Sequence, residues 1–148
     1  MVCVLSTLAL LSGCEQKIYQ YPFEQVFSNV VKVEVCRYYY ATNPENDHVT
    51  LVTELDSEKA EALLKDISEL PCYKHFGDFP MGSYGEIILR ISYTNGEAEV
   101  VGMVNSASVR IDGEWWVKAY YFDSKHWSAV LTEYVDVDLV PELKKYLE

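Results

Sequence analysis

Residues 86–104 have the sequence EIILRISYTNGEAEVVGMV. Apolar side chains stand at every second position of Glu86–Tyr93, which is the period of a strand with one buried face. Asn95 and Gly96 then predict a type I′ hairpin turn, because both central residues of that turn need a positive φ. Glu97–Val104 returns as the second strand. The segment therefore predicts an antiparallel hairpin.

One further hairpin is predicted before this segment and another after it. Val26–Tyr40 is rich in β-branched and aromatic residues, and its valines alternate with charged residues. A cluster of turn-forming residues separates it from His48–Leu55, its expected partner strand. Downstream, Ala107–Ile111 and Glu114–Tyr121 flank the tight-turn pair Asp112-Gly113. Consecutive hairpins of this kind build an antiparallel sheet.

Caps and apolar spacing predict two main helices. Asp56 or Ser57 caps the first helix, which ends before Pro71, and Asp123 or Ser124 caps the second. In each helix the apolar residues share one face: Ala60, Leu63, Leu64, Ile67 and Leu70 in the first, and Trp127, Val130, Leu131 and Tyr134 in the second.

A short tail helix is expected after Pro141, and the element order is β-β-α-β-β-β-β-α. We therefore predict an α+β domain, with an antiparallel sheet of about six strands and helices packed mainly on one face. The chain has 148 residues, which suits one domain with one core. Its net charge of −11 offers no basic face, so nucleic acid is excluded as a partner.

The N-terminal residues have the features of an export signal. Residues 1–13 contain no charged side chain, and their apolar run is too short to span a bilayer as a helix. The run ends in Leu11-Ser12-Gly13-Cys14, which is followed at once by polar residues. This segment resembles the lipobox of bacterial lipoproteins, although no Lys or Arg precedes the apolar run. The alternative is a buried N-terminal element with a chance cysteine.

The resemblance implies a processing route and a location. In that family a diacylglycerol is attached to the cysteine thiol, here Cys14, and a peptidase cuts just before it. Residues 1–13 would then be the signal peptide, and the mature chain would be held to a membrane of the bacterial cell envelope, outside the cytoplasm. Residues 14–25 are polar and lack periodicity, so we expect a lipidated tether, with residues 26–148 as the globular domain.

Cys36 and Cys72 remain after this processing. Outside the cytoplasm they can form a disulfide that ties the loop after the first helix to the sheet. The alternative is two separate buried thiols. A zinc site is not indicated, since no second pair of ligands lies nearby.

Signatures of catalysis are weak. The sequence has no GxSxG elbow, no phosphate-binding loop and no HExxH motif, and it indicates no metal or cofactor. His75 and Asp78 share the aromatic loop 71–85, where a histidine and a carboxylate together can act as a general base. They define the alternative that the protein is a small hydrolase. The other interpretation is that His75 is a solvated loop residue.

Aromatic side chains give the best functional indication. Consecutive aromatics in a strand point to opposite faces, so part of each run must lie on the face that the helices leave open. Exposed tyrosines and tryptophans favour binding of a partner. The candidate surface comprises Tyr38, Tyr40, Tyr73, Phe76, Phe79, Tyr84, Trp115, Trp116, Tyr120 and Tyr121. The alternative is that the loop and the tail helix cover this second face.

Together these features predict an exported, lipid-anchored binding module without enzymatic activity, whose partner is a protein or a small molecule. An acidic inhibitor or immunity protein, directed against a basic toxin or a lysozyme-like enzyme, is the second possibility, because its charge would steer it to such a partner.

Overall fold

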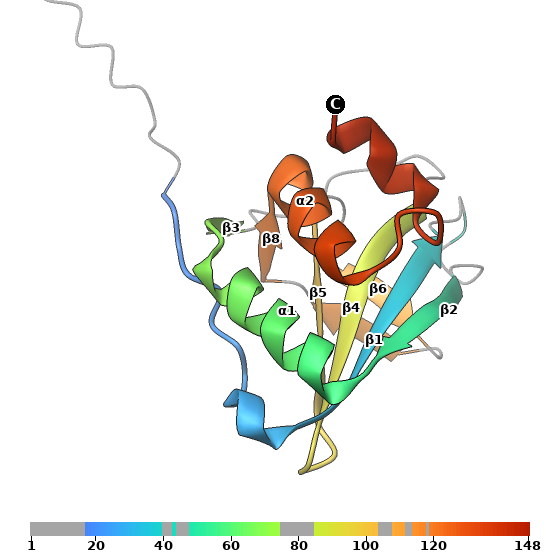
Figure 1. The fold of residues 1–148 in the computed structure, drawn as a ribbon. Coiled ribbons are helices and arrows are strands. Elements are labelled where there is room, and N and C mark those ends of the chain that lie inside the picture. The colour runs from blue at the N-terminus through green and yellow to red at the C-terminus, as the bar shows by residue number, and fades with distance from the viewer. Residues whose placement is uncertain are drawn as a thin grey trace, which may run out of the picture.

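The computed structural model describes residues 17–39, 43, 48–74, 85–103, 108–111, 114–117 and 119–148. Its centre is a four-stranded antiparallel sheet in the order β2-β1-β4-β5. The strands are β1 (Val30–Tyr39), β2 (His48–Leu55), β4 (Gly85–Tyr93) and β5 (Ala98–Gly102). Helices α1 (Ser57–Glu69) and α2 (Ser124–Tyr134) lie together on one face of this sheet (Figure 1). The predicted α+β class and antiparallel pairing are confirmed.

Both helices begin at the predicted caps. The Asp56 carboxylate accepts a hydrogen bond from the Lys59 amide at 2.9 Å, and Asp123 accepts from the first amides of α2. The chain becomes extended at Leu70, just before Pro71. The tail after Pro141 forms a 3-10 helix, η3 (Pro141–Tyr146).

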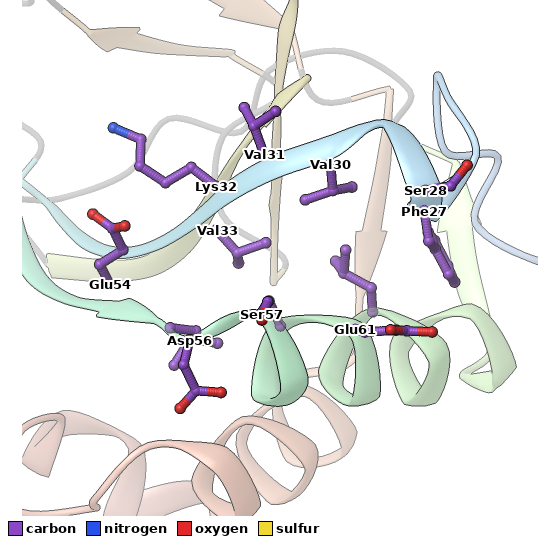
Figure 2. A pocket seen from close by; sticks show the side chains of 13 residues that line it. Phe27, Ser28, Val30, Val31, Lys32, Val33, Glu54, Asp56, Ser57 and Glu61 are labelled. Atoms are coloured by element: carbon purple, nitrogen blue, oxygen red, sulfur yellow. The ribbon is translucent and has the colours of Figure 1, made fainter. Parts of the chain in front are cut away.

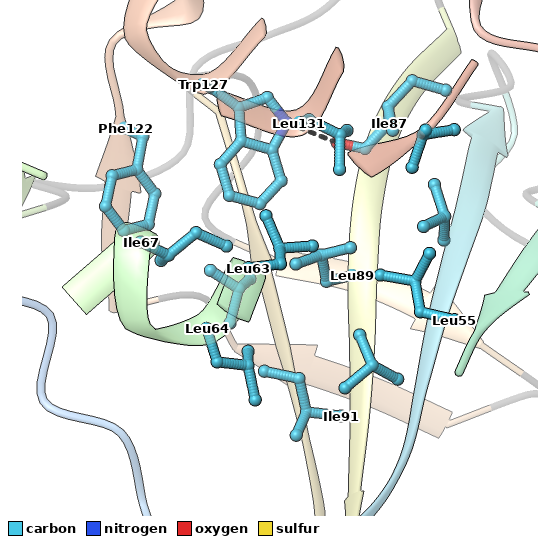
Figure 3. Close-up of a cluster of buried hydrophobic side chains, with 14 of the residues drawn as sticks. Leu55, Leu63, Leu64, Ile67, Ile87, Leu89, Ile91, Phe122, Trp127 and Leu131 are labelled. Atoms are coloured by element: carbon cyan, nitrogen blue, oxygen red, sulfur yellow. Dashed lines mark hydrogen bonds between the residues drawn. The ribbon is translucent and has the colours of Figure 1, made fainter. Parts of the chain in front are cut away.

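The main core lies between the sheet and these helices (Figure 3). Four of the residues predicted on the inner face of α1 are buried in this core, namely Ala60, Leu63, Leu64 and Ile67. Trp127 and Leu131 of α2 are buried beside them, and the Trp127 indole N–H donates to the Ile87 carbonyl at 3.2 Å. The sheet supplies alternate residues, among them Ile87, Leu89 and Ile91 of β4. The period-two pattern of β4 was therefore assigned correctly.

The predicted strand Glu114–Tyr121 is divided in two, which corrects the expected single sheet. β7 (Glu114–Val117) pairs with β6 (Ser108–Ile111), whereas β8 (Tyr120–Phe122) pairs with β3 (Cys72–Lys74). The division arises because Phe122 of β8 is buried in the main core while the β6–β7 hairpin crosses behind the sheet (Figure 1). Without the short strands β3 and β8, the order is the predicted β-β-α-β-β-β-β-α.

The turn between β4 and β5 also differs in type from the prediction. The Gly96 amide donates to the Tyr93 carbonyl at 3.0 Å, so the two central residues are Thr94 and Asn95. Gly96 alone takes the left-handed conformation, with φ of 85°, and the Glu97 amide donates to the Asn95 side chain. The Tyr93 amide donates to the Glu97 carbonyl at 2.9 Å, so the loop has three residues, 94–96, in place of the two-residue I′ loop.

A second apolar cluster occupies the opposite face of the sheet. It contains Cys36, Tyr38, Ile88 and Val100, and Val49 packs against it. β6 contacts β2 and β7 contacts β5, so the β6–β7 hairpin spans this face. The predicted exposure of Tyr38 is therefore wrong, because its side chain is fully buried there. The tail helix η3 does not cover this face, since its Leu143 lies in the main core.

The two cysteines lie on different faces. Cys36 belongs to the second cluster and Cys72 to the main core, and both thiols are free. Burial raises the pKa of each thiol to about 11. The disulfide alternative is therefore wrong, and the structure shows two separate buried thiols because the sheet lies between them.

The N-terminal segment is part of the domain, which corrects the predicted tether for residues 17–25. Tyr19 forms two backbone hydrogen bonds with Cys72, at 2.9 and 3.0 Å, and so extends the β3–β8 sheet. Aromatic rings then pack along the core: Tyr21 contacts Phe23 and Phe122, and Phe23 contacts Phe27. The segment ends in the 3-10 turn η1 (Phe27–Asn29). We call residues 17–29 the strap.

Removal of one buried side chain of α1 tests this packing. Leu63 is fully buried, so Leu63→Ala is expected to lower the free energy of unfolding by about 2–5 kcal/mol, from lost transfer energy and a residual cavity. The matched control is Leu139→Ala, because Leu139 is exposed and should change stability by less than about 0.5 kcal/mol. Denaturant unfolding measures both, and equal effects would mean that the inward face of α1 is wrongly assigned.

Candidate functional site

A cleft of about 400 Å³ lies where β1 begins, β2 ends and α1 starts (Figure 2). η1 closes one end of the cleft, the start of β1 forms one wall, and the first two turns of α1 form the wall that faces it. The lining residues are Phe27, Ser28, Val30, Val31, Lys32, Val33, Glu54, Leu55, Asp56, Ser57, Ala60, Glu61 and Leu64. We call this the α1 cleft.

A difference in strand length creates the α1 cleft. The last pair between β1 and β2 is Val33 with Leu55, and the chain then turns directly into α1 at the Asp56 cap. Val30–Lys32 of β1 therefore lies beyond the end of β2. On its other side this stretch pairs with β4. One backbone edge of Val30–Lys32 thus faces the α1 cleft instead of a strand.

The floor of the α1 cleft is apolar and its rim is acidic. Buried or half-buried side chains form the floor, namely Val30, Val33, Leu55, Ala60 and Leu64, and Val31 is 60% exposed at the opening. Glu54, Asp56 and Glu61 are exposed around the rim. A groove of this kind accommodates an apolar stem that carries a positive charge, such as a lysine or arginine side chain.

Lys32 is the basic residue among the lining residues, and it forms a salt bridge with Glu34 of the same strand. Its ammonium lies 3.1 Å from the Glu34 carboxylate, which also accepts from Arg90 at 2.8 Å. The hydrogen bond from Arg90 has the largest effect on the pKa of Glu34 and, together with that from Lys32, keeps this pKa below its ordinary value. Burial of the carboxylate acts in the opposite direction. Glu34 is shared between Lys32 and Arg90 and so neutralises Lys32 only in part, but the three exposed acids Glu54, Asp56 and Glu61 outnumber Lys32 and keep the rim acidic.

A buried glutamate fixes the strap that closes one end of the α1 cleft. Glu99 of β5 accepts hydrogen bonds from the Tyr21 hydroxyl at 3.0 Å, from the Glu24 amide at 3.3 Å and from the Tyr93 hydroxyl. Burial, and then the nearby carboxylate, raise the pKa of both tyrosines, so their hydroxyls stay protonated as donors. Burial and the neighbouring acids Glu99 and Glu97 also raise the pKa of Glu24.

The aromatic residues predicted as a binding surface are only partly brought together. Tyr73 and Tyr121 form a pair on one face of the β3–β8 ribbon, with ring centroids 5.6 Å apart, whereas Tyr120 lies on the other face against Tyr19. Tyr40, Phe76, Phe79 and Tyr84 lie outside the described residues, as do His75 and Asp78. Trp115 and Trp116 have backbones in β7, but their side chains are outside the described part.

Sequence reasoning missed the α1 cleft and the docked strap. The unequal lengths of the predicted strands, Val26–Tyr40 against His48–Leu55, are the signal for an overhanging β1. For the strap, the signal is the alternation of Tyr19, Tyr21 and Phe23 with polar residues and Pro22, which has the period of a strand.

In the ranges that the structure covers, no three His, Cys, Asp or Glu side chains are grouped so that they could hold a metal ion. No helix among the described elements is long and apolar enough to cross a membrane. No family model, curated protein or solved structure matches the chain. Its function is therefore inferred from the site and from the sequence.

Removal of one hydroxyl tests the docking of the strap. Tyr21→Phe deletes a hydrogen bond to a partly enclosed carboxylate, so we expect a loss of about 1.5–3 kcal/mol of stability. Hydrogen exchange should also accelerate at the Tyr19 and Glu24 amides. Tyr146→Phe is the control, since Tyr146 is half-exposed beside Lys145. If both variants behave alike in denaturation and exchange, Glu99 does not hold the strap.

Proposed function

We propose that the protein is an exported, lipid-anchored binding protein without enzymatic activity, and that its α1 cleft receives a basic segment of a partner protein. The observation that carries this proposal is the combination of an apolar floor with an acidic rim along an open strand edge. Each of the three features contributes a different part of the recognition.

The floor and the rim suit one type of side chain. The methylene stem of a lysine or arginine would pack on Val30 and Val31, the accessible valines of the lining, while its charged group would reach Glu54 or Glu61. Burial of the stem supplies affinity, and the charges supply specificity and a faster encounter. The net charge of −11 acts in the same direction at longer range.

The open edge of Val30–Lys32 suits an extended backbone. A partner segment that lies along this edge would add a short strand beside β1, where β2 has already ended. Main-chain hydrogen bonds would then hold the segment, and alternate side chains would point into the α1 cleft. The partner is therefore expected to present an extended, basic loop or terminus.

The anchor rests on the lipobox-like Leu11-Ser12-Gly13-Cys14. Lipidation of Cys14 would keep the domain at an envelope membrane, where exported partners pass or reside.

An inhibitor or immunity protein is the second candidate, and the acidic rim supports it directly. The active-site clefts of enzymes that act on anionic polymers are basic, and an acidic protein would be steered to them. The two candidates differ in one measurable property. A captured partner that is an enzyme and loses its activity on binding would identify an inhibitor.

Neutralisation of the rim tests the proposed function. The cleft variant carries Glu54→Gln, Asp56→Asn and Glu61→Gln, in which asparagine preserves the helix cap. The control variant carries Glu69→Gln, Glu133→Gln and Asp136→Asn, three exposed positions away from the α1 cleft with the same change in net charge.

Each chain is used to capture partners from the native envelope, and the association rate of any captured protein is then measured. We expect wild type and the control variant to capture the same basic protein. The cleft variant should associate at least about tenfold more slowly at low salt and lose this difference at high salt. Equal capture by both variants would show that the α1 cleft is not the binding site.

A further inference from the structure

We propose that the end of the molecule opposite the α1 cleft is a membrane-contact surface. Its residues are Lys17, Ile18, Tyr19, Tyr73, Lys74, Tyr120 and Tyr121, and we call it the tyrosine end. The inference rests on the proposed lipid anchor and adds to it a fixed orientation of the domain on the bilayer.

The side chains of the tyrosine end suit the interface between lipid and water. Two ring pairs flank the short β3–β8 ribbon, one on each face: Tyr19 lies edge-on to Tyr120, with ring centroids 5.6 Å apart, and Tyr73 lies against Tyr121 at the same distance. All four tyrosines are half-buried, and Ile18 is 62% exposed beside them. Tyrosine is favoured at membrane interfaces, because its ring is apolar while its hydroxyl remains hydrated.

The residues named for the tyrosine end carry two positive charges, and the adjoining end of α1 contributes one exposed acid, Glu69. The positive charges are those of Lys17, whose ammonium lies 5.2 Å from the centre of the Tyr19 ring, and of Lys74, which is exposed. Basic residues near a bilayer are attracted by anionic lipid headgroups. A chain with a net charge of −11 would be repelled by an anionic membrane, and the two lysines reduce this repulsion at the tyrosine end.

The short distance along the chain from Cys14 decides which end faces the membrane. Two backbone hydrogen bonds fix Tyr19 to Cys72 of β3. Cys14 precedes Tyr19 by five residues, which reach at most about 18 Å when fully extended. A lipidated Cys14 would therefore keep Tyr19 within about 18 Å of its point of attachment, so the tyrosine end is the part of the domain nearest to the headgroups. The free tether predicted for residues 14–25 would have allowed any orientation.

The same geometry places the α1 cleft away from the bilayer. α1 starts at the α1 cleft with Ser57 and ends at Glu69, shortly before β3 (Figure 1). Its 13 residues span about 20 Å at the rise of an α-helix. The anchored domain would thus contact lipid near the C-terminal end of α1. The α1 cleft, at the N-terminal end of this helix, would face partners away from the bilayer.

Site-specific fluorescence quenching tests this orientation. Lys74→Cys and Lys17→Cys place a thiol in the tyrosine end, and Glu61→Cys places one at the α1 cleft. Cys36 and Cys72 are buried and have raised thiol pKa values, so they react slowly with a maleimide dye. The full acylated chain, extracted from cells, is labelled and reconstituted in phosphatidylethanolamine–phosphatidylglycerol vesicles that contain a lipid with a nitroxide headgroup.

We expect several-fold stronger quenching of the dye at positions 74 and 17 than at position 61. Use of two positions guards against one variant that fails to fold. Equal quenching at all three sites on acylated, vesicle-bound protein overturns the orientation and leaves the anchor intact. Mass spectrometry of the same samples tests the anchor itself, because a mature chain without acyl groups on Cys14 overturns both the anchor and this inference.

Discussion

The buried carboxylate of Glu99 is the interaction on which the strap depends. It collects hydrogen bonds from Tyr21, Tyr93 and the Glu24 amide, and so joins a segment near the N-terminus to a strand in the middle of the chain. A buried carboxylate without such donors would be costly, so the strap and the glutamate stabilise each other. One end of the strap adds Tyr19 to the edge of β3, and the other end supplies Phe27 and Ser28 to the α1 cleft.

Both proposed surfaces follow from this one attachment. The strap runs beside the core from the tyrosine end to the α1 cleft, roughly parallel to α1 (Figure 1). Its docking shortens the free chain between Cys14 and the domain, and it also closes the end of the α1 cleft. Loss of the contacts to Glu99 would therefore loosen the wall of the α1 cleft and, if Cys14 is lipidated as proposed, the placement of the domain at the membrane. A protein that must hold a binding site at a defined height above a membrane would benefit from such a coupling.

The sequence predicted those elements that local patterns determine. Asp56, Pro71 and the apolar spacing between them specify α1, and the alternation in Glu86–Tyr93 specifies β4. The failures have a common physical cause, because each depends on contacts between distant residues. Tyr21 meets Glu99 across 78 positions. Tyr38 is buried because the β6–β7 hairpin covers its face, and Phe122 enters the main core because β8 leaves β7 to pair with β3. No local pattern encodes these partners.

We propose that the α1 cleft is the surface that contacts the partner protein in the cell. In-cell photocrosslinking from a cleft position tests it most directly, with the photoreactive residue at Ser57 and, as the control, at the exposed Glu133 of α2. We expect one discrete adduct from position 57, with a protein that carries an extended basic segment, and no such adduct from position 133. An adduct from position 133 alone, or identical adducts from both positions, would contradict the proposal.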